Sequence, residues 1–164
     1  MTTASLPPAG PALTPAPEPV PGLEQALWAL RAYDTTALAT VSFAGPHVAG
    51  VFFAPERVGS GLRLLLAVLR GSRMQLDIAA DPRVAFMCSP GNPTRWVQGA
   101  GRAVPVADET EHHRLYLRLL EHAPGARTFV EDLRVTPVIL AVERLKVVET
   151  DGGPPLLLDF GGSD

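Results

Sequence analysis

The apolar and polar positions along the chain follow two different periods, and these predict helices and strands in a definite order. Leu23, Ala26, Leu27 and Leu30 have the spacing of one helix face, so we predict a helix over residues 23–33. Apolar and β-branched runs separated by Gly- and Pro-containing turns predict the strands. The predicted strands cover residues 37–43, 47–54, 62–69, 83–89, 95–106 and 136–150, the last as one strand or a pair, with residues 55–61 as a loop.

Two further helices are predicted from capping boxes. Ser72 is followed three residues later by Gln75, and Asp108 by Glu111. In a capping box each of the two side chains accepts a hydrogen bond from the other residue's backbone N–H. Asp81-Pro82 ends the first helix, because the residue before proline disfavours helical geometry. The second helix is predicted to continue to Ala123.

The order of these elements predicts the fold class. Strands and helices do not alternate regularly, which excludes a doubly wound sheet, and the short turns favour antiparallel pairing. We therefore predict a mainly β (α+β) domain, an antiparallel β-barrel with flanking helices. The expected divisions are a disordered Pro/Ala-rich tail over residues 1–21, the barrel over 22–152, and a C-terminal tail over 153–164.

Composition narrows the possible partners and location. The 164 residues carry a net charge of −3 with scattered basic residues, so we expect no nucleic-acid partner. No run of about 18 apolar residues is present to span a membrane, and no signal peptide is recognisable. We expect a cytoplasmic protein.

The cysteine and the histidines offer little chemistry. A single cysteine, Cys88, excludes an intrachain disulfide, and its setting in "VAFMCSP" favours a small buried apolar side chain over a catalytic thiol. His112 and His113 are adjacent, so they point about 100° apart on a helix of 3.6 residues per turn. Without a spacing such as His-Glu-x-x-His, we expect no metal site.

The stretch "RGSRMQLDIAADPRVAFM" (residues 70–87) places two arginines at the start of a predicted helix. Positive side chains are locally unfavourable there, since the helix dipole attracts anions. Gly71, Ser72 and Arg73 together could hold a phosphate group, with the free N–H groups of the helix. A capped helix with solvated arginines remains the alternative.

A resemblance favours the phosphate interpretation. The blocks "LATVSFAGPHVAGVFFAPE", "LRLLLAVLRGSRMQLDIAADPRVAFM" and "RWVQGAGRA" keep the order and spacing of three motifs of a known family. Over residues 36–103 the chain resembles the FMN-binding split-barrel family typified by pyridoxamine 5'-phosphate oxidase. The resemblance implies a six-stranded antiparallel split β-barrel with Greek-key topology, bound FMN, and a homodimer with the flavin at its interface.

The resemblance also implies which residues bind the cofactor. The family's Ser-Arg-Lys motif holds the FMN phosphate; Ser72 and Arg73 match it, Met74 stands at the lysine position, and Arg70 is a candidate for the missing charge. Trp96 stands where a glutamine is common. The implied cofactor-binding residues are Val48, Ala49, Gly50, Val51, Ala67, Val68, Leu69, Arg70, Ser72, Arg73, Met74 and Trp96.

The implied function is FMN-dependent oxidation or reduction of an unidentified small molecule. Because the flavin performs the chemistry, no catalytic side chain is expected. The Arg-x-His motif that grips pyridoxamine phosphate has no counterpart in "PPLLLDFGGSD". Similarity to haem-utilisation proteins, including the segment "HAPGARTFVEDL", leaves a non-catalytic carrier of flavin or haem as the alternative. A structural barrel without cofactor is a third possibility.

Overall fold

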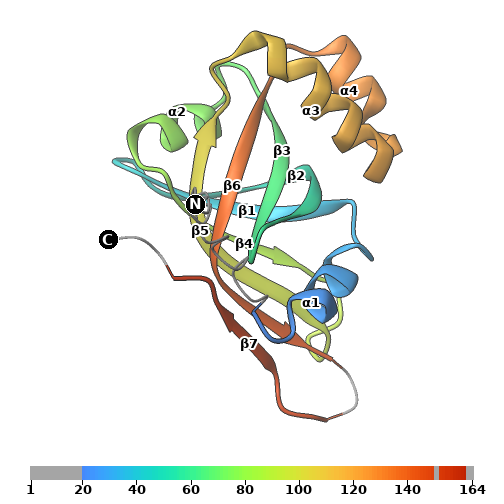
Figure 1. Cartoon of the computed structure of the whole chain (residues 1–164). Coiled ribbons are helices and arrows are strands. Elements are labelled where there is room, and N and C mark those ends of the chain that lie inside the picture. Colours follow the sequence, from blue (N-terminus) through green and yellow to red (C-terminus); the bar gives the residue numbers. More distant parts are fainter. Residues whose placement is uncertain (1–19, 150–151, 162–164) are drawn as a thin grey trace, which may run out of the picture.

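The computed structural model describes residues 20–149 and 152–161, which form a β-barrel with helices on its outside (Figure 1). Residues 1–19 of the predicted N-terminal tail lie outside this description. The strands are β1 Thr35–Ser42, β2 Gly45–Val58, β3 Gly61–Leu69, β4 Arg83–Cys88, β5 Trp96–Pro105, β6 Val135–Val148 and β7 Leu156–Asp159. The helices are α1 Leu23–Leu30, α2 Arg73–Ala80, α3 Glu109–His122 and α4 Arg127–Asp132, with a 3₁₀ turn over Pro124–Ala126.

The strand order confirms the predicted antiparallel barrel with flanking helices. The sheet has the order β3-β2-β1-β4-β5-β6-β7, and an additional pairing of β3 with β6 closes six of its strands into a barrel. Every adjacent pair is antiparallel. Because β4 lies beside β1 after the β1-β2-β3 meander, the topology is a Greek key.

Strand β6 is long enough to pair with two strands along one edge. Its first half, Val135 to Ala141, pairs with β3 and closes the barrel, while Arg144 to Val147 pair with β7. Strand β5 pairs with β6 on its other side along almost the whole length. Part of the segment expected as a C-terminal tail therefore forms an added strand, with Leu158 only 5% exposed.

Strand β2 extends further than the sequence predicts. The segment expected as a loop over residues 55–61 continues β2 to Val58, and a two-residue turn leads directly into β3. Pro55 fits in this strand because β1 pairs with β2 only as far as Phe52. The N–H of Phe53 donates to the carbonyl oxygen of Asp34, on the β1 side of β2. The nitrogen of Pro55, two residues on, faces this same side, where β2 no longer has a paired strand, so its missing N–H disrupts no ladder.

The core explains why β3 is almost entirely apolar. Leu64, Leu66 and Val68 face the barrel interior, where the apolar face of α1 also packs. Leu65 and Ala67 face the opposite side and are covered by α3. Strand β3 is therefore buried on both faces over most of its second half.

The predicted capping boxes form only in part. The hydroxyl of Ser72 accepts from the N–H of Gln75 at 3.3 Å, but the Gln75 side chain accepts from Gly71, not from Ser72. Glu111 forms an ion pair with Arg114 at 2.7 Å instead of returning to Asp108. Asp108 still begins α3, because its carboxylate accepts from the N–H of Thr110 at 2.9 Å.

The close approach of β5 and β6 gives a first prediction. A side chain at Gly101 would overlap the carbonyl oxygen of Ala141, and backbone cannot move aside as a side chain can. We expect Gly101→Ala to lower the free energy of unfolding by about 3 kcal/mol, the upper part of the usual range for overpacking. Urea denaturation would measure the loss. Gly50→Ala is the control, since its Cβ would meet nothing within 4 Å, and an equal loss there would contradict the explanation.

Candidate functional site

The N-terminus of α2 follows directly from the end of β3 and is open to an anion. Gly71 has a φ of 77°, a left-handed conformation that glycine adopts without strain. Ser72 caps the helix, and the side-chain oxygen of Gln75 accepts a hydrogen bond from the Gly71 N–H at 2.5 Å. The N–H groups of Arg73 and Met74 have no acceptor among the described residues. Such unsatisfied donors at a helix start favour a bound anion.

The Arg73 side chain connects α2 to the β1–β2 turn. Its Nη2 donates to Ser42 Oγ at 3.2 Å and to the carbonyl oxygen of Gly45 at 3.0 Å. Its Nε lies 3.7 Å from Asp77 Oδ2. The side chain is 45% exposed, so the oriented guanidinium still has donors that reach solvent.

Asp77 is a buried carboxylate beneath this arginine. Its side chain is only 6% exposed and accepts from the Thr40 hydroxyl at 2.8 Å. His47 Nδ1 lies 3.9 Å from the same oxygen, and within the described residues it is the buried side-chain polar atom without a hydrogen bond. Because a buried charge needs partners, Asp77 restrains Arg73 at the helix start.

Arg70 does not join Arg73. Its backbone N–H donates to the carbonyl oxygen of Arg134 at 2.8 Å. Its charge acts on Tyr116 of α3: burial raises the pKa of the Tyr116 hydroxyl, and Arg70 works against this rise. The structure thus directs the two arginines toward different elements. The Met74 side chain is 3% exposed in the core, so only its backbone N–H faces the site.

The β2 residues of the predicted set alternate between two faces. Val48 is 63% exposed and Gly50 also lies on the outer face, whereas Val51 points into the core and Ala49 packs partly against it. On the outer face Val48 pairs with Ala39 of β1. Two of these four predicted residues therefore present an accessible surface.

The β3 residues and Trp96 are placed less favourably. Ala67 and Val68 are buried, and only Leu69, at 41% exposure, reaches the surface. Trp96 starts β5, whereas Ala103 of the same strand donates to the carbonyl oxygen of Pro82, just after α2, at 2.8 Å. The seven-residue separation corresponds to about 23 Å of strand. A single chain therefore does not bring Trp96 to Arg73.

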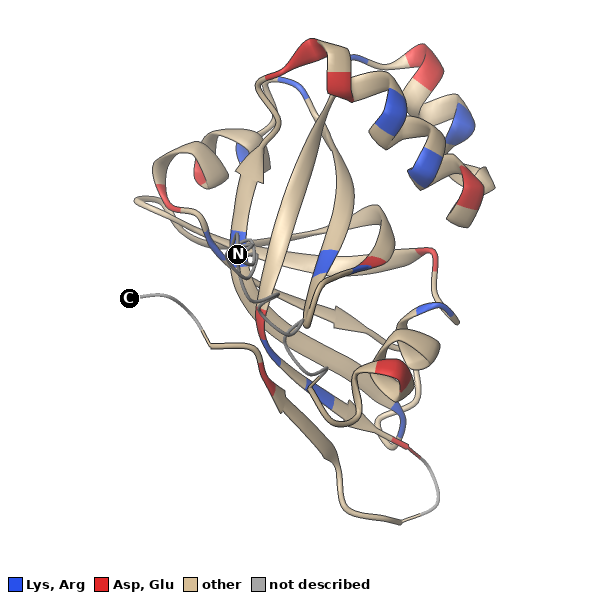
Figure 2. Ribbon diagram, in the orientation of Figure 1, with Lys and Arg blue, Asp and Glu red and all other residues tan. Residues whose placement is uncertain are grey.

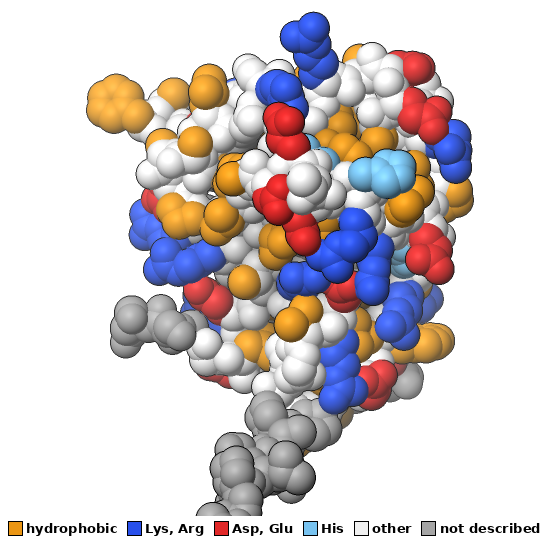
Figure 3. Space-filling view, turned by 45° about the horizontal axis from the view of Figure 1, so that its top comes forward, with side chains coloured by type: hydrophobic (Ala, Val, Ile, Leu, Met, Phe, Trp, Pro, Cys, Tyr) orange, Lys and Arg blue, Asp and Glu red, His pale blue; other side chains and the backbone are white. Residues whose placement is uncertain are grey.

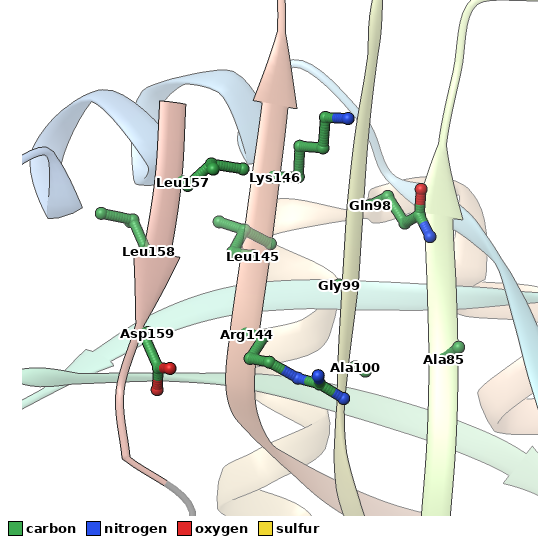
Figure 4. Close-up of a pocket in the computed structure, with 10 residues that line it drawn as sticks. All are labelled: Ala85, Gln98, Gly99, Ala100, Arg144, Leu145, Lys146, Leu157, Leu158 and Asp159. Atoms are coloured by element: carbon green, nitrogen blue, oxygen red, sulfur yellow. The ribbon is translucent and has the colours of Figure 1, made fainter. Parts of the chain in front are cut away.

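Another hollow lies elsewhere, on the outer face of β4 to β7 (Figure 4). It is a groove of about 580 Å³. Sequence reasoning assigned it no role, although alternation along β5 places Gln98 and Ala100 on one face. Its lining residues are Ala85, Gln98, Gly99, Ala100, Arg144, Leu145, Lys146, Leu157, Leu158 and Asp159.

The charges elsewhere are balanced. Acidic and basic residues are interspersed along α3 and α4 (Figure 2). The space-filling view shows apolar side chains among the charged ones on the surface (Figure 3). Glu56, for example, accepts from Arg63 at 2.6 Å and also from Arg118. In the ranges 20–149 and 152–161, no three His, Cys, Asp or Glu side chains are grouped to hold a metal ion.

Cys88 lies inside the barrel and is 1% exposed. Burial raises the pKa of its thiol to about 11, and a hydrogen bond with Thr36 opposes this only in part. A thiolate is therefore scarce near neutral pH, and the geometry favours the apolar role over the catalytic one. Among the described helices, none has the length and apolar composition to cross a membrane.

Comparisons with known proteins identify the fold. No family model matches the sequence, and no curated protein matches it. Among solved structures, a Clostridium acetobutylicum protein related to general stress protein 26, of the pyridoxinephosphate oxidase family, superposes with a TM-score of 0.65 at 11% identity, over 85% of this chain and 94% of that one. General stress protein 26 from Bacillus anthracis gives 0.61 at 20% identity, over 85% and 99%.

A haem-binding protein from Mycobacterium smegmatis is also similar, with a TM-score of 0.65 at 20% identity. The match covers 83% of this chain but only 57% of that protein. These neighbours agree with the resemblance seen in the sequence: the chain has the split-barrel fold of pyridoxamine 5'-phosphate oxidase-like proteins.

The position of Cys88 gives a second prediction. We expect a thiol reagent such as 5,5'-dithiobis(2-nitrobenzoic acid) to leave the folded protein unmodified at pH 8, because the thiol is both buried and protonated. One equivalent should react after unfolding in guanidinium chloride. Absorbance of the released thiolate measures both states, and rapid reaction of the folded protein would mean that Cys88 is accessible.

Proposed function

We propose that this protein binds FMN and acts as a flavin-dependent oxidoreductase on a small molecule. The observation that carries the proposal is the start of α2, where two free backbone N–H groups and the oriented guanidinium of Arg73 lie within one helical turn. A phosphate is the group that such donors hold well. The split-barrel neighbours from the pyridoxinephosphate oxidase family support FMN as the molecule that carries this phosphate.

The donors at the start of α2 fit a phosphate monoester. They include one guanidinium, that of Arg73, where the Ser-Arg-Lys motif would supply two cationic side chains. Arg73 can use the donors that are not engaged with Ser42 and Gly45. The helix dipole adds partial positive charge at the same place. Asp77 lies beneath Arg73 and restrains its orientation, at the cost of offsetting part of its charge.

The barrel would supply a surface for the ring system. Val48 and Gly50 of β2 and Leu69 at the end of β3 are the predicted residues whose accessible positions suit that role. FMN, when bound, supplies the electron-transfer chemistry. The chain's own residues would bind the phosphate, orient the ring and limit the access of water to it.

A non-catalytic carrier is the alternative, and the haem-binding neighbour is the observation that favours it. An oxidoreductase would cycle its flavin between two redox states with an electron donor and a substrate, whereas a carrier would bind without turnover. The visible spectrum of the purified protein separates flavin from haem.

The buried, reduced Cys88 is compatible with the cytoplasmic location that we also propose.

The phosphate contact gives a third prediction. We expect Arg73→Ala to weaken FMN binding by about 1.5–3 kcal/mol, the range for a hydrogen bond to a charged group, or roughly tenfold or more in affinity. Riboflavin lacks the phosphate, so its affinity should remain almost unchanged. Fluorescence quenching of both flavins provides the measurement.

Arg83→Ala is the matched control for this variant. Arg83 is an exposed arginine close to the other end of α2 and is paired with Asp81 at 2.6 Å. Its loss should leave the affinity for both flavins unchanged. If Arg73→Ala weakened FMN and riboflavin equally, or neither, the arginines would be a solvated helix entrance and the proposed phosphate site would be wrong.

A homodimer is part of the proposal. The outer face of β2 and β1, continued by Met87 at the end of β4, combines small residues with exposed apolar ones, among them Val41 at 47%, Val48 at 63% and Met87 at 46% exposure. A second copy covering this face would remove the apolar surface from water. It would also enclose a ring that lies on the outer surface of the barrel.

The fourth prediction tests the dimer. We expect light scattering to give twice the chain mass of 17.4 kDa at micromolar concentration. The interface of such a dimer should bury more than about 2,000 Å². Met87→Glu should shift the protein toward the monomer, because it places a charge on the apolar face. Leu117→Glu, at a 55% exposed position on α3, should not. A monomeric wild-type protein would exclude this assembly.

A further inference from the structure

The groove on the outer face of β4 to β7 is separate from the proposed phosphate site. It contains no residue of α2, β1, β2 or β3 (Figure 4). Its volume of about 580 Å³ lies within the roughly 300–1,000 Å³ of pockets that bind small molecules. It therefore has the size of an independent ligand site.

The floor of the groove is flat because its residues are small. Ala85 of β4 and Ala100 of β5 are paired neighbours on the outer face. Gly99, which precedes Ala100 on β5, adds no side chain, and one built there would point inward and overlap the ring of Phe86. Leu157 of β7, which is 67% exposed, forms the opposite wall. A flat apolar floor of this kind suits a planar ring.

A β-bulge determines which charge reaches this floor. The register of β5 and β6 shifts between Ala100 and Gly101, so that Glu143 is the extra residue on β6. Glu143 pairs with Arg102 at 3.2 Å, which leaves Arg144 opposite Ala100. Bulges commonly redirect a side chain in this way beside functional sites.

Arg144 has no ion-pair partner within the described residues. Asp159 lies directly opposite it in the β6–β7 register, but its carboxylate accepts from the N–H of Gly161 at 2.9 Å and forms no salt bridge with Arg144. Figure 4 shows the guanidinium extending away from Asp159, toward Ala100. An arginine that lies across an apolar floor without a carboxylate partner is suited to bind an external anion.

Lys146 adds a second positive charge to the groove. Its Nζ lies 5.2 Å from the centre of the Trp96 ring, a cation–π contact, and no carboxylate is paired with it among the described residues. The groove thus has two cations against the single acid Asp159. Gln98 of β5, the cross-strand partner of Lys146, offers a neutral hydrogen-bonding group.

From this geometry we propose that the groove binds a planar aromatic carboxylate. The ring lies on Ala85 and Ala100 against Leu157, and the carboxylate receives hydrogen bonds from Arg144. Lys146, two residues beyond Arg144 on β6, adds electrostatic attraction for the carboxylate. The inference goes beyond the proposed flavin site and holds whether or not FMN binds at α2.

The test uses 2-naphthoate as the probe and its neutral analogue 2-naphthamide as the matched ligand. The full-length protein is titrated by calorimetry, with and without saturating FMN. Naphthoate should bind about tenfold more tightly than the amide, as for one charge-assisted contact. Arg144→Gln should abolish that preference, and Ala100→Leu should weaken both ligands because it fills the floor.

Arg102→Gln is the control variant. Arg102 also lies on the outer face of β5 but is engaged with Glu143. Its replacement should leave the preference for naphthoate unchanged, and thermal unfolding should confirm that each variant is folded. Equal affinity for the acid and the amide, no binding of either, or the same effect from Arg102→Gln as from Arg144→Gln would overturn the proposal. FMN affinity, measured separately through Arg73, would be unaffected by any of these results.

Discussion

The pairing of β3 with β6 is the interaction on which the rest of the structure depends. It joins residues far apart in the chain, from Arg63 with Ala141 to Leu69 with Val135, and converts an open sheet into a closed barrel. Closure encloses the core cluster that α1 covers and leaves the other face of β3 for α3. Because β3 is buried on both sides, it holds its C-terminal end, and with it the start of α2, in a defined place.

The two candidate sites follow from this closure in different ways. The anion site uses the end of β3, where Arg73 connects α2 to the β1–β2 turn above the buried Asp77. The groove depends on the other half of the long β6 strand, which extends past the barrel and pairs with β7. One strand thus closes the barrel with its first half and builds a ligand surface with its second.

Local signals were sufficient for much of the fold. Alternation and turn residues predicted the strands, and Ser72 and Asp108 marked the starts of two helices correctly. The prediction of a loop at Pro55 was wrong, because whether proline is tolerated depends on which edge of β2 lacks a neighbour. The strand over Leu156–Asp159 was missed since four residues carry little periodicity, and only β6 gives them a partner.

By itself, the sequence determined the order of the elements, the faces that are buried and the presence of an arginine at a helix start, because these depend on spacing and local chemistry. The tertiary structure alone decided where the side chains of that stretch point. Arg70 lies toward α3, Met74 enters the core, and Arg73 remains at the site. It also decided that Arg144 faces the groove, since that orientation depends on a bulge between strands whose residues are distant in the chain.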